Sequence, residues 1–126
     1  MPLYLREADV EALLGPADAV EAVEACFARM ARGAVNAKPR LRLALEPGLL
    51  HVMAAADREL GVAGLKAYVT GGGARRPVVT LHDSGSGELV ALVEAERLGR
   101  LRTGARKIRV RVHREDLALL AGRSSQ

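Results

Sequence analysis

Three short motifs place basic side chains where they could hold an anion. Pro39-Arg40 precedes an alternating stretch, Lys66 lies within an apolar run, and Arg102-Thr103 ends a helical segment. A lysine ammonium in an apolar strand is costly to desolvate unless a partner or a ligand anion meets it. An arginine offers a forked pair of donors that matches the two oxygens of a carboxylate. If these side chains converge on one pocket, the sequence predicts a site for a small carboxylate ligand.

A second interpretation of the same residues needs no ligand. Lys66 could extend along the sheet and place its ammonium in solvent at a sheet edge, with Arg40 and Arg102 as surface charges. Composition and spacing leave both interpretations open.

Other kinds of catalytic or metal site are not indicated. His51, His82 and His113 are scattered without ligand spacing, and no serine lies in a nucleophile motif. We therefore predict no metal site and interpret the histidines as structural. Cys26 is the only cysteine, which excludes an internal disulfide, and its place on an apolar helical stripe predicts a small core residue.

Two helices are predicted near the N-terminus. Residues 1–5 are apolar enough for a strand, and 7–14 suit a short helix closed by Gly15. Pro16 then favours the first turn of a second helix, which Gly33 ends as a left-handed cap. The apolar residues of this helix recur at spacings of three and four: Val20, Val23, Phe27 and Met30.

From residue 39 the hydrophobic period changes to two, which predicts strands. Residues 40–45 alternate strictly, and Glu46-Pro47-Gly48 supplies a turn. Further strands are predicted over 49–55, 62–70, 78–82 and 88–93, and a helix over 94–102. Helices followed by about six mostly antiparallel strands predict an α+β fold with the N-terminal helices packed on the sheet.

The last twenty or so residues differ in character. Residues 107–113 alternate basic and β-branched side chains, which predicts a strand, and 115–121 suit a short helix. We therefore expect a ligand-binding domain over 1–105 and a basic tail over 106–126. Basic residues crowd between 97 and 114, and such a run can attract nucleic acid. With only 2% aromatic residues the chain offers no stacking platform, so we expect no nucleic-acid partner.

Length and composition indicate a soluble globular protein. The 126 residues are 49% hydrophobic and 27% charged, and no apolar run approaches the roughly 20 residues of a membrane span. The N-terminus carries acids instead of a signal peptide, so a cytoplasmic location is expected. Asn36 and Gln126 are the only side-chain amides, which together with many Arg and Glu residues indicates a heat-adapted source.

Five segments in order resemble the N-terminal part of the ornithine cyclodeaminase/mu-crystallin family, over about residues 3–105. They are PR…RLRL, LLHVMAA, GVAGLKAYVTG, LHDSGSGELVALVEA and LRTGA. The resemblance implies an ancestor with NAD(P)-dependent chemistry on small amino or imino acids, including ketimine reduction. It also implies a sheet that pairs with a second subunit, completing a barrel-like sheet in a homodimer or larger oligomer.

Carried over position by position, the resemblance assigns five residues to a substrate site. Arg40 and Arg102 are similar to the arginines that meet the substrate carboxylate. Lys66 is similar to the catalytic lysine beside the substrate. Met53 matches a methionine that lines the pocket, and Thr103 lies where the family threonine faces the cofactor side.

Two departures from the family pattern bear on the substrate. His51 stands where ornithine-specific members carry a glutamate, and Ala54 replaces the proline usual after the methionine. Both departures disfavour ornithine and leave a smaller substrate, such as alanine or a cyclic imine.

The resemblance implies NAD or NADP as the family's cofactor, but the motif that would bind it is not found in these residues. A dinucleotide site needs a strand, a G-x-G-x-x-G turn and a helix. Gly71-Gly72-Gly73 is followed by 74–77 instead of a helix, so we interpret it as a hairpin loop, with a phosphate cradle as the alternative. The family's catalytic aspartate also lies outside the matched part.

We therefore expect a domain that binds a small carboxylate without a cofactor of its own and is inactive alone. The family pattern ends after Ala105, and HREDLALLAG resembles the family's returning C-terminal segment. The rival hypotheses are an oligomerisation scaffold with an idle pocket and a nucleic-acid binder that uses the basic tail.

Overall fold

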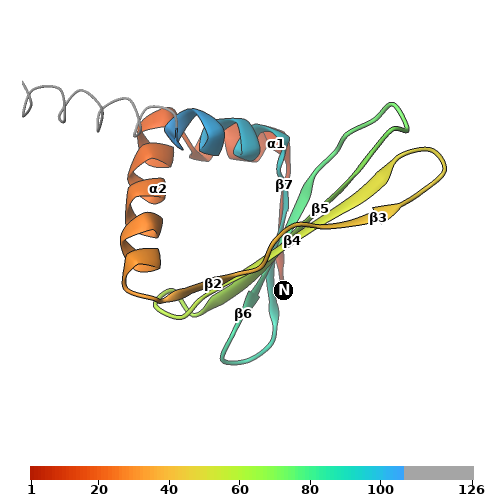
Figure 1. The fold of residues 1–126 in the computed structure, drawn as a ribbon. Helices are drawn as coiled ribbons and strands as arrows, with labels where there is room; N and C mark the ends of the chain where they lie inside the picture. Colours follow the sequence, from red (N-terminus) through yellow and green to blue (C-terminus); the bar gives the residue numbers. More distant parts are fainter. Residues whose placement is uncertain (107–126) are drawn as a thin grey trace, which may run out of the picture.

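The computed structural model describes residues 1–106, which form helices on one side of a seven-stranded sheet (Figure 1). Residues 96–106 form a third helix. The other elements, in chain order, are β1 (Leu3–Leu5), α1 (Glu7–Leu13), α2 (Pro16–Ala31), β2 (Val35–Ala37), β3 (Leu41–Ala44), β4 (Leu49–Asp57), β5 (Val62–Thr70), β6 (Val78–Asp83) and β7 (Leu89–Glu94).

The strands form one open, mixed sheet. Their order is β1-β7-β6-β5-β4-β2, and β3 pairs with β4 beyond the short β2 ladder. All pairs are antiparallel except β1 with β7, which is parallel. The predicted α+β class is confirmed. The barrel across a dimer stays a prediction.

One additional strand and several element ends differ from the sequence expectation, and two of these differences have clear local reasons. β2 was not expected, because three residues that include Asn36 are too short to show a period of two. The helix predicted from residue 94 begins at residue 96, because Glu94 is still paired with Val78 in the sheet. The backbone N–H of Ala95 then donates to the carbonyl of Pro77, which turns the chain out of β7.

The side of the sheet that faces the helices holds a small apolar core. Val10 of α1 is buried against Ala91 and Val93 of β7, and partly buried residues pack around them. The surrounding residues are Leu5, Leu14, Val79, Leu81 and Leu98. Residues 96–106 and α1 are thereby fixed next to each other at one end of the sheet.

A carboxylate on α1 also anchors the helix over 96–106. Both oxygens of Glu7 accept backbone N–H groups at the start of that helix, from Glu96 at 2.8 Å and from Arg97 at 3.1 Å. These are donors that the first helical turn cannot satisfy internally. Glu7 therefore holds one end of the helix that carries Arg100 and Arg102.

In contrast to α1, α2 buries none of its residues, and it is attached to the sheet by ion pairs at its C-terminal end. Arg29 pairs with Asp57, and Arg32 pairs with Glu59 at 3.0 Å. Cys26, which was expected to be a small core residue, is therefore only half-buried.

The tips of two hairpins lie side by side because two glycines meet there (Figure 1). A Cβ on Gly71 would lie 2.5 Å from the Cα of Gly48, and a Cβ on Gly48 would lie 1.7 Å from the carbonyl oxygen of Thr70. Both glycines also have positive φ, at 97° and 99°. The contact positions the loop over residues 71–77.

The expected strand over 107–113 and helix over 115–121 lie outside the described residues, as does most of the basic tail. Within residues 1–106, no helix has the length and apolar character needed to cross a membrane.

Candidate functional site

A cavity of about 500 Å³ lies on the helix side of the sheet. Its walls come from β4, β5, the loop over 71–77 and the helix over 96–106, with Arg40 ahead of β3. The structure brings all five predicted site residues to this one cavity: Arg40, Met53, Lys66, Arg102 and Thr103. Their roles in binding or catalysis remain predictions.

Strand register determines which side chains face the cavity. Met53 of β4 pairs with Lys66 of β5, and His51 pairs with Tyr68. Because side chains alternate between the two faces of a strand, all four lie on the helix side. Leu65 and Val69 consequently lie on the opposite side of β5.

Tyr68 is the centre around which the cations of the cavity gather. Its side chain is buried, and the Arg75 guanidinium lies 4.5 Å from the ring centroid. The Lys66 ammonium lies at 5.7 Å and the Arg40 guanidinium at 6.0 Å. A tyrosine ring attracts cations at such distances through the negative charge of its π face. One aromatic ring thus attracts three positive charges, although these charges still repel one another.

His51 supports Tyr68 from beneath. The two rings are stacked, with centroids 4.6 Å apart and an interplanar angle of 11°. The Nε2 of His51 is 2.9 Å from the hydroxyl of Thr70. Burial is the main cause that lowers the pKa of His51, and the charges of Arg42, Arg40 and Arg75 lower it further. The imidazole is therefore neutral at neutral pH and acts as a flat structural support.

The Lys66 ammonium is destabilised by its surroundings. Desolvation is the largest cause that lowers the pKa of Lys66, and Tyr68 opposes it. The positive charges of Arg102, Arg75 and Arg40 lower this pKa further. Gly99 borders the ammonium so closely that a Cβ there would lie 3.4 Å from Nζ. An anion placed in the cavity would relieve this destabilisation, because it would favour the charged form of the lysine.

The remaining predicted residues form the rim. The Nε of Arg40 lies 3.4 Å from the sulfur of Met53, a weak acceptor. Arg102 and Thr103 are exposed on the helix. The hydroxyl of Thr103 donates to the carbonyl of Gly99 at 2.9 Å, one turn earlier.

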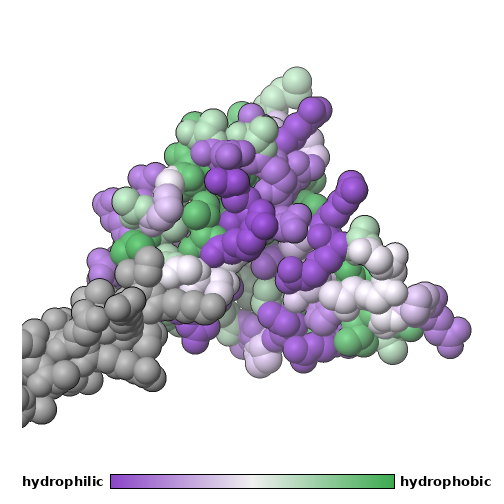
Figure 2. All heavy atoms as spheres, turned by 90° about the horizontal axis from the view of Figure 1, so that it is seen from above, coloured by the Kyte–Doolittle hydropathy of each residue, from purple (hydrophilic) through white to green (hydrophobic). Residues whose placement is uncertain are grey.

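The described residues do not balance the positive charge in the cavity. Among the described lining residues, Glu96 alone carries a carboxylate. The ion pairs within residues 1–106 involve Arg29, Arg32 and Arg97, none of which lines the cavity. Hydrophilic side chains gather across the face seen from above, where the helices meet the strand ends (Figure 2). The cavity is therefore electrostatically suited to an anionic ligand.

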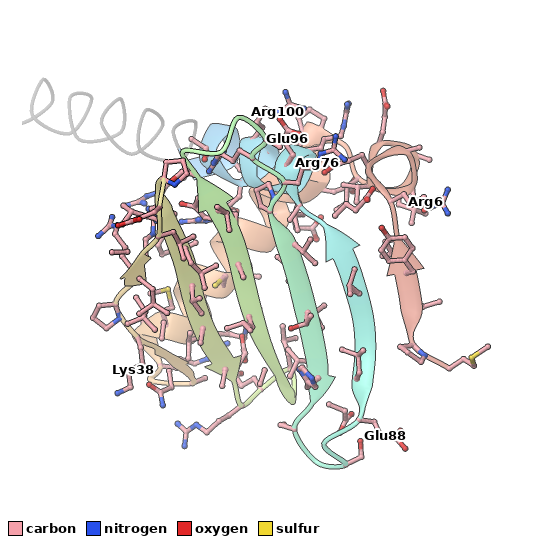
Figure 3. All side chains as sticks on the ribbon, turned by 90° about the vertical axis from the view of Figure 1, so that its right-hand side faces the viewer. Arg6, Lys38, Arg76, Glu88, Glu96 and Arg100 are labelled. Atoms are coloured by element: carbon pink, nitrogen blue, oxygen red, sulfur yellow. The ribbon has the colours of Figure 1, made fainter. Side chains whose placement is uncertain are left out.

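Several lining residues were not predicted from the sequence, among them those with the polar side chains Tyr68, Arg75, Glu96 and Arg100. Tyr68 could have been found, since it follows Lys66 by two residues and must share its face. Arg75 gave no such signal, because it lies in a loop whose path depends on the contact between Gly48 and Gly71. Glu96 and Arg100 lie on the helix above the sheet, near Arg76 of the same loop (Figure 3).

The glycine loop does not have the structure of a dinucleotide-phosphate site, and the described residues form no metal cluster. Gly71-Gly72-Gly73 joins two antiparallel strands and leads into β6 instead of a helix. This loop therefore lacks the helix N-terminus on which a pyrophosphate rests. In residues 1–106 no group of His, Cys, Asp and Glu side chains is arranged to hold a metal ion.

Three solved structures resemble this fold closely. A probable ornithine cyclodeaminase from Bordetella pertussis Tohama I is 30% identical, with a TM-score of 0.78 over 83% of this chain and 34% of its own. The iminosuccinate reductase of Paracoccus denitrificans, in complex with NAD⁺, is 32% identical (TM-score 0.77; 82% and 35% covered). An archaeal alanine dehydrogenase dimer with bound NAD is 31% identical (TM-score 0.74; 82% and 34% covered).

The chain spans about a third of the length of these structures. No curated protein sequence matches it significantly. The sequence profile of the Ornithine cyclodeaminase/mu-crystallin family matches residues 2–111, a few residues further than the motifs alone indicated. The match covers most of the chain, and the chain belongs to the Ornithine cyclodeaminase/mu-crystallin family.

Proposed function

We propose that this chain binds a small amino, imino or keto acid in the cavity around Tyr68 and associates with a second copy of itself. The observation that carries the proposal is the set of cations at one cavity without a carboxylate paired to them in an ion pair among the described residues. Arg40 and Arg102 would bind the ligand carboxylate through paired N–H donors, and the Lys66 ammonium would add a third positive charge.

The named relatives support the size of the ligand. Alanine and iminosuccinate are small acids, and the structures named for them share this fold at 31% and 32% identity. The cavity of about 500 Å³ also falls in the range of small-molecule sites. The replacement of a glutamate by His51, which is neutral here, favours such acids over a diamino acid because no anion is offered to a second amine.

Lys66 is proposed as the catalytic residue of the whole protein. Its lowered pKa brings the ammonium closer to neutrality, as acid–base work requires. Hydride transfer itself needs NAD or NADP, which the family uses, and the glycine loop of this chain leads into a strand instead of the helix on which a pyrophosphate would rest. We therefore propose that the 126 residues alone bind the ligand without turning it over.

Titration calorimetry at pH 7 and low salt tests ligand binding. The panel contains L-alanine, L-aspartate, pyruvate and succinate, with NAD and NADP added separately. We expect at least one acid to bind, and Lys66→Gln to weaken its binding about tenfold or more, because a charged donor is lost.

Lys38→Gln is the matched control, because it makes the same charge change at an exposed lysine outside the cavity. Lys38 lies well away from Glu96 and Arg100 at the cavity (Figure 3). No binding of any acid would refute the ligand proposal, and NAD-dependent turnover by the 126 residues would refute the proposed inactivity.

The association proposal rests on the other face of the sheet, which no described helix covers (Figure 1, Figure 3). By register, this face carries rows of exposed or half-buried apolar side chains: Leu41, Leu43, Leu50, Val52, Leu65 and Val69. A second copy would cover these side chains and the edge strand β3. A scaffold with an idle cavity predicts the same association without ligand binding, so calorimetry separates the two functions.

A further inference from the structure

We propose that the ligand is a dicarboxylate, with its second carboxylate bound by Arg75 over the ring of Tyr68. This inference rests on the proposed function and adds the chemical class of the ligand. It arises from Arg75, which the family resemblance assigns no role.

The first argument is charge. An amino acid with one carboxylate is a zwitterion without net charge, and it would leave the cavity as positive as before. The cations at the cavity are Arg40, Lys66, Arg75, Arg100 and Arg102, against the single carboxylate of Glu96. Like charges at close range in a half-buried site repel each other more strongly than in water. A second carboxylate on the ligand reduces this repulsion, whereas an uncharged side chain does not.

The second argument is position. Arg40, Lys66 and Arg102 come from the strands and the helix, whereas Arg75 comes from the loop between β5 and β6. Arg75 is also the cation closest to the Tyr68 ring, at 4.5 Å. A guanidinium over a ring contacts it through its flat π face, and its N–H donors remain available at its edge. Arg75 can therefore hold Tyr68 and a carboxylate at the same time.

The third argument is rigidity. Tyr68 cannot tilt freely, because the buried His51 ring is stacked beneath it at 4.6 Å and is itself held by Thr70. The loop that carries Arg75 is fixed at its start by the contact between Gly48 and Gly71. A charged donor held in place before the ligand arrives loses less entropy on binding.

The test compares ligands that differ only in the second carboxylate. L-Aspartate and L-asparagine are nearly isosteric, and succinate and succinamate form the same comparison without the amine. Calorimetry with the full 126-residue chain at pH 7 and low salt should show the dicarboxylate binding at least tenfold more tightly in one pair. Arg75→Gln should lower the affinity for that dicarboxylate far more than the affinity for its amide, so that most of the preference for the dicarboxylate is lost.

Arg76→Gln is the matched control, because Arg76 is the next residue and does not line this cavity. It should keep the preference for the dicarboxylate, and circular dichroism should show both variants folded. Equal binding of acid and amide by the unmodified chain would overturn the inference and leave the proposed function standing. A preference that survives Arg75→Gln would overturn the role of Arg75. No binding of any of the four ligands would overturn the inference, and if L-alanine and pyruvate also fail to bind, the proposed function itself is overturned.

Discussion

The pKa of Lys66 depends on the burial and the charges of the whole cavity. Its ammonium is half-buried among arginines and lies 5.7 Å from the ring centroid of Tyr68, the one neighbour among the described residues that opposes the lowering of its pKa. Burial and the surrounding charges lower the pKa of Lys66, so folding disfavours its charged form. This gives the protein a stability that depends on pH in a predictable direction.

We predict that the free energy of unfolding rises with pH in the alkaline range. Between the lowered pKa of Lys66 and the ordinary lysine value of about 10.4, the unfolded chain holds the proton that the folded chain has released. Below that window both states are protonated, and the penalty for the buried charge is present in full. Urea unfolding at several pH values should show this rise.

Lys66→Gln should flatten the rise, whereas Lys38→Gln, at an exposed lysine outside the cavity, should leave it unchanged. Equal slopes in the unmodified chain and Lys66→Gln would contradict the prediction. Carboxylate affinity should fall as pH rises through the same window, since neutral Lys66 attracts an anion less.

The sequence was sufficient to predict several of the strand and helix residues that line the cavity, and insufficient for those of the loop. Arg40, Met53 and Lys66 could be predicted because each lies on or beside a strand with a family-like motif. Arg75 could not, because no local pattern specifies where residues 71–77 fold. Tyr68 was overlooked although its spacing from Lys66 placed it on the same face.

Among the elements, the two hairpin tips combine the tightest packing with the strongest sequence restriction. Gly48 and Gly71 approach so closely that neither position has room for a side chain, and both have positive φ. The tips belong to different hairpins, β3–β4 and β5–β6, so their contact ties the start of the Arg75 loop to the rest of the sheet.

We predict that Gly71→Ala lowers the free energy of unfolding by about 1–3 kcal/mol or more. The Cβ of the alanine would clash with the backbone of the other hairpin, at a position whose φ is already unfavourable for alanine. Gly72→Ala is the control, since nothing lies within 4 Å of a Cβ there, and it should change stability by less than about 0.5 kcal/mol. Thermal or urea unfolding measures both. Equal effects of the two substitutions would contradict the role of the close contact.

Most elements could be predicted from periodicity and turn residues. The strand over Val62–Thr70 agrees at both ends with the expectation, and α2 begins at Pro16 as its fixed φ favours. The parallel pairing of β1 with β7 could not be predicted, because it joins residues nearly ninety positions apart and depends on how α1 and α2 return the chain.

At the scale of the whole molecule, the two faces of the sheet differ in chemical character. The helix side carries the cavity and the small core, and the opposite side carries uncovered leucines and valines. Because successive residues of β5 alternate between the faces, Lys66 and Tyr68 lie on the cavity side, whereas Leu65 and Val69 lie on the opposite side. The chain therefore contains more hydrophobic residues than the core of the described part buries.

We predict that the chain is a dimer or larger oligomer and that Leu43→Lys together with Leu65→Lys makes it a monomer. These side chains are 49% and 39% exposed, and a charge at either would be buried without a partner on association. Sedimentation equilibrium measures the state. Leu60→Lys, in the turn after β4, is the control because its equally apolar side chain is 59% exposed and lies off this face. A monomeric unmodified chain would contradict the prediction.

The unbalanced cations around Tyr68 also have a practical consequence for handling the protein. Sulfate, phosphate and citrate carry more than one negative charge, so a purification buffer that contains them would occupy the cavity and raise the melting temperature. In such a buffer a carboxylate ligand would have to displace the bound anion. The measured affinity of every carboxylate would therefore be lower than its true affinity. A preparation in a zwitterionic buffer with little chloride leaves the arginines available. The order in which simple salts then raise the melting temperature is an inexpensive first measure of which anions the site prefers.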